Sequence, residues 1–178
     1  MDSPRSAAKL AGGFYLLNIA TGGAALFLRG PLGAVVLLIA STSYVAVTVL
    51  FYALFRAVHP TLSAVAAAFS LVGCAISILT VTQFVSIAVN PLVFFGCYCL
   101  LIGYLIARST FLPRILGGLL ALGGLGWLTF LSPTFSRTLA PYNLAPGILS
   151  EAALAFWLLT AGVNADRWAQ QKRATSAA

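Results

Sequence analysis

The chain has 178 residues, of which 61% are hydrophobic and 7% are charged, and its mean hydropathy is +1.01. A soluble domain carries roughly 25% charged residues, so this composition cannot cover a water-facing surface. The net charge of +7 does not indicate a nucleic-acid partner either, because the basic residues are scattered between apolar runs instead of forming one patch. We therefore expect an integral membrane protein whose main partner is the lipid bilayer.

Six apolar runs follow one another along the chain, and each is close to the roughly 20 residues with which a helix crosses a bilayer. The first, at about 7–28, ends at Arg29-Gly30-Pro31, and the second covers 32–55. A secretory signal peptide is the alternative for the first run, but a retained span fits better because the run is long and lacks a clear cleavage site. The third run, 61–89, is the longest and most polar, and it ends at Asn90-Pro91, where proline cannot continue a helix.

The second half of the chain supplies three more runs, at 91–107, 114–131 and 147–163, and the prolines within 132–146 indicate a loop. The tail, 164–178, is polar, and we expect its last residues to be disordered. Trp168, close to three basic residues, suits a short segment at the lipid headgroups. The predicted fold class is all-α: a polytopic six-helix membrane bundle with short loops in one domain (1–163), followed by a cytoplasmic tail (164–178).

The basic residues set the predicted orientation. With six spans both termini share one side, which holds eight of the ten Lys and Arg residues, whereas the other side holds only Arg29 and Arg137. Because basic loops stay in the cytoplasm, we predict that both termini are cytoplasmic and that the protein lies in a plasma or bacterial inner membrane.

Small residues are the predicted contacts between helices, because lipid tails are as apolar as leucine and burial of leucine cannot drive helix pairing in a membrane. They are dense in the first, third and fifth runs, which we therefore place at close helix contacts. Homo-oligomerisation through such a face, or contact with a partner in a membrane complex, stays open.

Glu151 is the only acidic residue inside the six runs. An ionised carboxylate at the bilayer centre costs about 2.5–3.5 kcal/mol or more, so Glu151 must be protonated, paired or in contact with water. If its helix begins near Gly147, it lies roughly 6 Å deep. One interpretation is a helix-end group that the helix dipole favours and that pairs with Arg29 or Arg137.

The other interpretation is a ligand site around Glu151. Polar residues at a similar predicted depth are Gln83, Tyr98, Asn18, Thr21 and either Ser41 or Ser43. If they face inward together, they line a cavity that opens to the outside, with Arg29 and Arg137 at its mouth. Such a cavity would suit a small amphipathic or cationic ligand, or a proton.

Catalytic and metal-binding patterns are missing from the sequence, which has no nucleophile–base arrangement, metal-ligand cluster or phosphate-binding loop. We therefore expect no cofactor and no metal, and we lean towards a non-catalytic protein. Cys74, Cys97 and Cys99 lie in apolar runs without a CxxC motif, which indicates small hydrophobic residues. His59 lies on the side opposite Glu151, so the two should not form an acid–base pair.

Three segments carry a resemblance to a known family: FFGCYCLLIGYLIARS (94–109), FLPRILGGLLALGGLGWL (111–128) and LSEAALAFWLLTAGVN (149–164). With the opening AAKLAGGFYLL from Ala7, they resemble the bacterial membrane-protein family known as domain of unknown function 4386. The resemblance spans nearly the whole chain, and Phe-Leu-Pro-Arg-Ile-Leu-Gly is its most specific part.

This resemblance implies a small polytopic membrane protein without an assigned activity. It also implies a role for Glu151, because family members keep a glutamate at that place. Members often have histidine near the position of Tyr98, and often Arg and Glu around Ser70 and Gly73. This sequence departs from the family there, which removes charge from the third helix and makes it a packing element.

These observations favour a non-catalytic membrane protein that binds a hydrophobic or amphipathic small molecule, or a lipid, in an outward-facing polar pocket near Glu151. A structural or accessory subunit of a larger membrane complex is the alternative. A membrane-embedded enzyme or a small transporter comes third.

Overall fold

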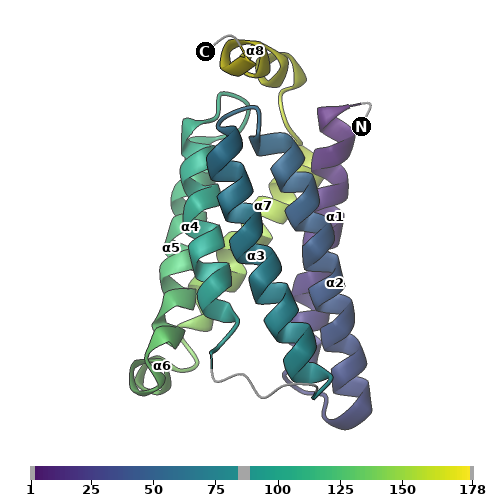
Figure 1. Cartoon of the computed structure of the whole chain (residues 1–178), viewed down its shortest axis with the longest axis vertical. Helices are drawn as coiled ribbons and strands as arrows, with labels where there is room; N and C mark the ends of the chain where they lie inside the picture. The colour runs from purple at the N-terminus through teal and green to yellow at the C-terminus, as the bar shows by residue number, and fades with distance from the viewer. Residues whose placement is uncertain (1–2, 84–88, 177–178) are drawn as a thin grey trace.

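The computed structural model describes residues 3–83 and 89–176, and within these ranges it contains helices and no strand. Six of these helices are long, and Figure 1 shows that they run along the bundle axis. They are α1 (Pro4–Ala25), α2 (Gly30–Phe55), α3 (Pro60–Val81), α4 (Leu92–Arg108), α5 (Arg114–Leu128) and α7 (Leu144–Thr160). Three short elements complete the fold: the 3₁₀ helix η1 (Thr129–Leu131), α6 (Pro133–Leu139) and α8 (Ala165–Ser176).

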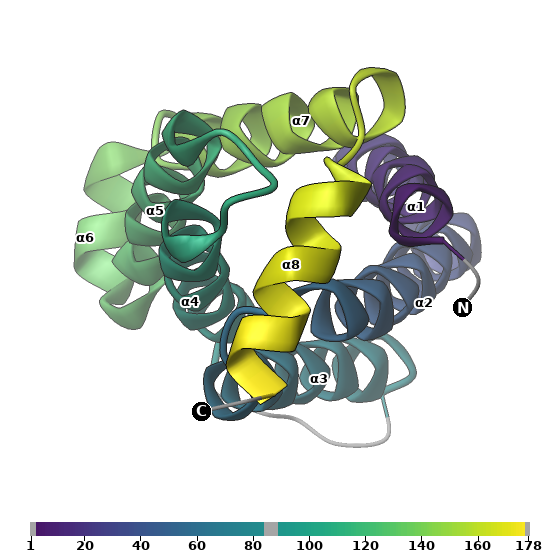
Figure 2. The same ribbon diagram turned by 90° about the horizontal axis from the view of Figure 1, so that it is seen from above.

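The long helices form a ring. Each packs on the next in the order α1, α2, α3, α4, α5, α7, and α7 closes the ring against α1. Viewed along the axis, α8 lies across one end of this ring (Figure 2). The beginning of α1 lies at that same end, and α6 lies at the opposite end (Figure 1).

Local sequence explains where several helices begin and end. Proline occupies the first turn of α1, α2 and α3, where its missing N–H would have no helical partner in any case. His59 caps α3, because its Nδ1 accepts a hydrogen bond from the Leu62 N–H at 3.2 Å. Gly162, with a φ of +67°, ends α7 in the left-handed conformation that favours glycine.

Paired glycines allow the closest helix approach, between α4 and α5. A Cβ on Gly103 would lie 2.7 Å from the Gly117 carbonyl oxygen, and one on Gly117 would lie 2.5 Å from that of Gly103. Gly96 and Gly124 repeat the arrangement farther along the same two helices. Since real Cβ atoms do not approach so closely, a larger residue at any of the four would separate the helices.

We placed the first, third and fifth runs at close helix contacts, and small residues of α1, α3 and α5 do lie at such contacts. The partners are their neighbours in the ring, because α1, α3 and α5 do not contact one another. Gly73 of α3, for example, lies against Phe95 of α4. Gly117 and Gly124 of α5 face α4, Gly123 of α5 faces α7, and Gly12 of α1 also lies against α7. Other glycines of α1, such as Gly13 and Gly22, face open space.

Several helices could cross a membrane. Among the described residues, three segments are long and apolar enough: Gly30–Phe55, Pro60–Val81 and Arg114–Leu131, the last of which joins α5 and η1. The pair α6 and α7, which meet at a bend of 77°, would count as a fourth if it is one broken span. The all-α prediction is confirmed, and three to four helices of the described chain have the length and apolarity of membrane spans.

Some predicted boundaries differ from the observed ones. The third helix is not the longest, because α3 ends at Val81 after 22 residues whereas α2 has 26. The part of the predicted run at 84–88 lies outside the described residues. The α7 helix begins at Leu144, three residues before Gly147, so Glu151 lies about 10 Å from the start of its helix at about 1.5 Å per residue, instead of the predicted 6 Å or so.

Two segments predicted as irregular are partly helical. The loop 132–146 contains α6, whose Ser132 hydroxyl accepts a hydrogen bond from the Phe135 N–H. The tail forms α8 as far as Ser176, so the prediction of a disordered end is wrong for these residues. Trp168, predicted for a segment at the lipid headgroups, packs on the bundle, and its Nε1 donates a 2.9 Å hydrogen bond to the Leu54 carbonyl.

The α8 helix is fixed to the loops that it crosses. The Thr175 hydroxyl donates to the Ala57 carbonyl, and Gln171 bonds to the Arg108 carbonyl and to Thr110. These bonds join α8 to the connection between α2 and α3 and to the connection between α4 and α5. This end of the ring is therefore closed by hydrogen-bonded structure.

Candidate functional site

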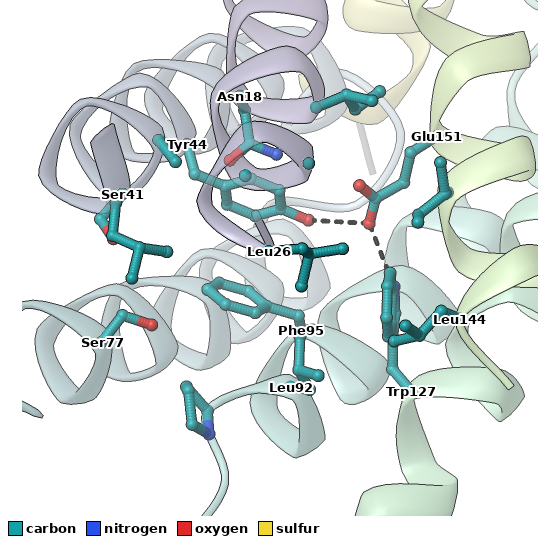
Figure 3. Close-up of a pocket in the computed structure, with 17 residues that line it drawn as sticks. Asn18, Leu26, Ser41, Tyr44, Ser77, Leu92, Phe95, Trp127, Leu144 and Glu151 are labelled. Carbon is teal, nitrogen blue, oxygen red and sulfur yellow. Dashed lines mark hydrogen bonds between the residues drawn. The ribbon is translucent and has the colours of Figure 1, made fainter. Parts of the chain in front are cut away.

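A cavity of about 290 Å³ lies in the half of the bundle away from α8. Most of its lining is apolar, and it draws on all six long helices or on residues next to them (Figure 3). Of the residues that line it, one is acidic and none is basic. They are Asn18, Ile19, Gly22, Gly23, Leu26, Leu37, Ala40, Ser41, Tyr44, Ser77, Pro91, Leu92, Phe95, Trp127, Leu144, Ile148 and Glu151.

Glu151, on α7, is the acidic residue of this lining, and only 5% of it is exposed. Its Oε1 atom accepts hydrogen bonds from three donors: Trp127 Nε1 at 3.2 Å, the Tyr44 hydroxyl at 3.4 Å and Cys99 Sγ at 3.5 Å. The bonds from Tyr44 and Trp127 converge on one oxygen in Figure 3. The carboxyl group is thus held by α2, α4 and α5 together.

The second carboxyl oxygen of Glu151 is in a different position. Among residues 3–83 and 89–176, no side chain or backbone group donates a hydrogen bond to Oε2. It is also not one of their fully buried unpaired polar atoms, which are the Tyr98 hydroxyl and Asn143 Oδ1. Oε2 therefore keeps accessible surface, and its residue lines the cavity.

Glycine and serine on neighbouring helices make room for this arrangement. The Trp127 ring lies directly over Gly147, so that any side chain at Gly147 would collide with it. Gly123 in the same way accommodates Ser150, the residue before Glu151. The packing of α5 on α7 through these small residues brings Trp127 Nε1 within reach of Glu151.

A second group of polar side chains continues from the cavity into the ring. The Tyr15 and Tyr44 hydroxyls lie 3.4 Å apart, and the Thr48 hydroxyl is 2.6 Å from that of Ser70. The Tyr98 ring packs on Tyr44 with a centroid distance of 5.7 Å. All five side chains are buried. The polar interior thus extends from Glu151 towards the middle of the bundle.

Farther towards α8 the interior becomes aromatic and apolar. Tyr15 contacts Phe51 edge to face, Phe51 contacts Phe55 in the same way, and Phe55 packs on Phe111, with centroid distances of 5.6–5.9 Å. We call Phe51, Phe55 and Phe111 the aromatic row. Each is at most 4% exposed. The row separates the cavity from the end of the bundle that α8 covers.

Only some of the predicted site residues meet at the cavity. Asn18, Ser41 and Glu151 line it together. Tyr98 is buried behind Tyr44 and does not line the cavity, although its ring belongs to the same cluster. Thr21 lies outside the lining, and its hydroxyl donates to the Leu17 carbonyl of its own helix.

The other predicted residues lie apart from Glu151. Gln83 is exposed just beyond the end of α3, with a φ of +58°, and it is not part of the lining. Arg29 precedes α2 and Arg137 lies on α6; both are exposed. Neither arginine is a hydrogen-bond partner of Glu151, whose partners are two aromatic residues and one cysteine.

Sequence reasoning missed the residues that hold the carboxyl group. Tyr44, Trp127 and Cys99 are separated by up to 107 positions from Glu151, and each stands in an ordinary apolar run. Cys99 was interpreted as a small hydrophobic residue, yet its thiol also donates to Glu151. The spacing of Ser41, Tyr44 and Thr48 along one face of α2 is the signal that could have indicated an inward polar stripe.

Within the part of the chain that the structure describes, no three His, Cys, Asp or Glu side chains come together to hold a metal ion. The three cysteines are free thiols. The described chemistry of the site is therefore that of one carboxyl group, hydroxyl and indole donors, and apolar side chains.

Comparison with known proteins agrees with the resemblance seen in the sequence. Residues 88–162, which include α4, α5 and Glu151, match the family described as "Domain of unknown function (DUF4386)". The chain belongs to this family. It is also 30% identical over 124 residues to an uncharacterised protein of Archaeoglobus fulgidus, an alignment that covers 66% of this chain and 76% of the relative. No solved structure matches the chain.

Proposed function

We propose that this DUF4386 protein is a six-span integral membrane protein. In support, α2, α3 and α5 each have the length and apolarity of a span. The α4 helix packs between α3 and α5, and α1 and α7 close the ring between α2 and α5. Since the helices run side by side, α1, α4 and α7 would enter the bilayer with their neighbours. Outward leucines and isoleucines, such as Ile115 at 71% exposure, fit contact with lipid tails.

The orientation follows from charge, with α8 and the beginning of α1 in the cytoplasm. The α8 end carries Arg5, Lys9, Arg56, Arg108, Arg114 and the basic residues of α8, whereas Arg29 and Arg137 lie towards the other end. The test is labelling of single cysteines placed at Thr134 on α6 and Gln170 on α8, both exposed. A membrane-impermeant maleimide should label Thr134→Cys in intact cells and Gln170→Cys only after lysis. The reverse pattern would contradict this orientation.

Within that frame we propose that the protein binds a hydrophobic or amphipathic small molecule in the cavity beside Glu151, without catalysis. The observation that carries the proposal is the combination of a mainly apolar space of about 290 Å³ with one buried carboxyl group on its wall. Ligand sites in proteins are typically concave, mostly apolar and equipped with a few convergent polar groups, and this volume is near the lower limit of their range.

Binding fits the geometry better than the two alternatives that involve chemistry or transport. An acid–base enzyme would need a histidine, a lysine or a second carboxyl group beside hydroxyl nucleophiles such as Ser41 and Ser77, and the described cavity lining has one carboxyl group and no such partner. A transport path would have to continue past the aromatic row and α8, which fill the opposite end. An accessory subunit would contact its partner through an outer helix face, and such a contact would not account for the cavity inside the ring.

The test uses Trp127, which lines the cavity, as a fluorescent reporter. Trp157→Phe and Trp168→Phe leave Trp127 as the single tryptophan of the chain. In dodecyl maltoside micelles, the neutral amphiphile 8-bromooctan-1-ol should quench Trp127 saturably, since bromine quenches only on close approach. Gly22→Leu should abolish saturable quenching, because Gly22 lines the cavity and a Cβ there meets no atom within 4 Å.

Gly13→Leu is the matched control. Gly13 lies on the same helix and also faces open space, but it does not line the cavity, so this variant should bind the probe as the parent protein does. Quenching that rises without saturation, or that is equal in both glycine variants, would mean that the probe does not occupy the cavity, and the proposal would fail.

A further inference from the structure

We propose that the ligand of this cavity carries a positive charge, as an amphipathic ammonium compound does, and that Glu151 and three aromatic rings bind its cationic head. This inference rests on the proposed function, because it names the chemical class of the molecule that the cavity takes.

The carboxyl group of Glu151 is held but not neutralised. Three donors engage Oε1, while Oε2 accepts no hydrogen bond from the described residues. A buried ionised carboxylate is costly unless a positive charge or further donors compensate it. Among the lining residues that the structure describes there is no Lys, Arg or His that could do so. A cationic group in the cavity, next to Oε2, would supply the missing partner.

Aromatic rings add a second feature that favours a cation. Tyr44, Phe95 and Trp127 all line the cavity, and Figure 3 shows their rings around the space next to the Glu151 carboxyl group. The rings of Tyr44 and Phe95 are 4.7 Å apart at their centroids. Faces of aromatic rings attract cations, and groups of such rings are a known way to bind quaternary ammonium compounds.

The rest of the lining indicates what is attached to the cationic head. Leu26, Leu37, Leu92 and Ile148 give the remaining walls an apolar character that suits a hydrocarbon tail. Since none of the described lining residues is basic, a phosphate next to the ammonium group would find neutral donors such as Asn18 and Ser41 but no cationic partner there. The chemistry therefore favours a phosphate-free amphipathic cation over the ammonium headgroup of a phospholipid.

The experiment compares a cation with its uncharged copy. Benzyltrimethylammonium and neopentylbenzene have the same shape, because a carbon atom replaces the nitrogen, and each is used to displace 8-bromooctan-1-ol from the single-tryptophan protein. The quantity measured is the ratio of the competitor's apparent dissociation constant in Glu151→Gln to that in the parent protein. Partitioning into micelles cancels in this ratio, since the micelles are the same in both measurements.

We expect Glu151→Gln to raise the apparent dissociation constant of benzyltrimethylammonium about tenfold, which corresponds to the loss of a charge interaction of about 1.4 kcal/mol. The apparent dissociation constant of neopentylbenzene should rise less than about twofold. Asp166→Asn is the matched control, because it removes a negative charge on exposed α8, far from the cavity, and should change neither compound. Glu151→Asp, which keeps the charge, should retain the preference for the cation.

Each outcome separates this inference from the proposed function. If 8-bromooctan-1-ol binds and Glu151→Gln changes the apparent dissociation constants of both competitors equally, the cavity binds ligands without selecting a positive charge. This inference would then be wrong, while the proposed function would stand. If the bromo-alcohol does not bind saturably, both fail.

Two further measurements sharpen the assignment. Phe95→Leu should lower the affinity for the cation more than the affinity for its neutral copy. Phe94→Leu is the control, because Phe94 packs on Phe69, and it should affect both affinities equally. Displacement of the probe by phosphatidylethanolamine added to the micelles would contradict the choice of a phosphate-free cation.

Discussion

The two ends of the helix ring are filled in different ways. Towards α8, the aromatic row packs with Leu105, Ile106 and Leu158, and each of these side chains is nearly or completely inaccessible. Towards the other end, the helices surround a cavity with a carboxyl group on its wall. The α2 helix shows both situations on one face, which changes from Ser41, Tyr44 and Thr48 to Phe51, Leu54 and Phe55.

This contrast indicates a division of roles between the ends. Filled interiors gain dispersion contacts, whereas a cavity forfeits them and a buried carboxyl group adds a desolvation cost. Departures from good packing of this kind are tolerated where function requires them. We therefore expect the α8 end to contribute most of the stability and the cavity end to contribute the binding site.

The largest effect should come from opening the aromatic row. Phe51→Ala removes a ring that is 1% exposed and that contacts both Tyr15 and Phe55, so the free energy of unfolding should fall by about 3–5 kcal/mol. SDS titration followed by circular dichroism in mixed micelles measures the change. Tyr52→Ala, on the adjacent outward-facing residue, is the control and should cost far less. Equal losses would show that the row is not a stability element.

The glycine contact between α4 and α5 should give the next largest effect. Gly117→Ala places a Cβ against the Gly103 carbonyl and should lower the free energy of unfolding by about 1–3 kcal/mol through overpacking. Gly118→Ala meets no atom within 4 Å and should be neutral or stabilising by about 0.5–1 kcal/mol. The same titration distinguishes the two adjacent variants, and a similar response in both would contradict the packing described here.

At the cavity end, a substitution should raise the free energy of unfolding instead of lowering it. Without ligand, Glu151→Gln should raise the free energy of unfolding by about 1–2 kcal/mol, because the amide keeps an acceptor for Trp127 and removes a buried charge that lacks a cationic partner. Asp166→Asn, on the exposed surface of α8, should have little effect. If Glu151→Gln were as destabilising as Phe51→Ala, Glu151 would be a structural residue and the proposed division between the two ends would be wrong.

The smallest effect concerns the attachment of α8. Trp168→Phe removes the hydrogen bond to the Leu54 carbonyl while keeping an aromatic ring, so stability should fall by about 0.5–1 kcal/mol. Hydrogen exchange at the amides of α8 should increase, while exchange around Glu151 should not change. Trp157→Phe, on a half-exposed residue of α7, is the control. Increased exchange at the cavity in Trp168→Phe would show that the two ends are coupled.

Much of the architecture was predictable from composition and hydropathy. The predicted all-α class is confirmed, and the family resemblance is confirmed over residues 88–162. The starts of the second, fourth and fifth runs agree with α2, α4 and α5 within two residues. These features depend on local chemistry: apolar runs of sufficient length, proline at helix starts and glycine at close contacts. The end of the third run, the start of α7, and the helices α6 and α8 were not foreseen, because helix ends depend on capping and docking contacts.

The sequence alone determined that Glu151 is exceptional, since a single acidic residue among apolar runs requires an explanation whatever the fold. Only the tertiary structure decided its surroundings. The partners predicted from depth, Gln83 and the two arginines, lie elsewhere, whereas Tyr44, Cys99 and Trp127 come from helices that the ring places around α7. Hydropathy indicates which segments are apolar enough to cross a bilayer, but it does not indicate which side of a helix faces inward or which helices become neighbours. Those choices depend on how closely glycines such as Gly147 allow one helix to approach another.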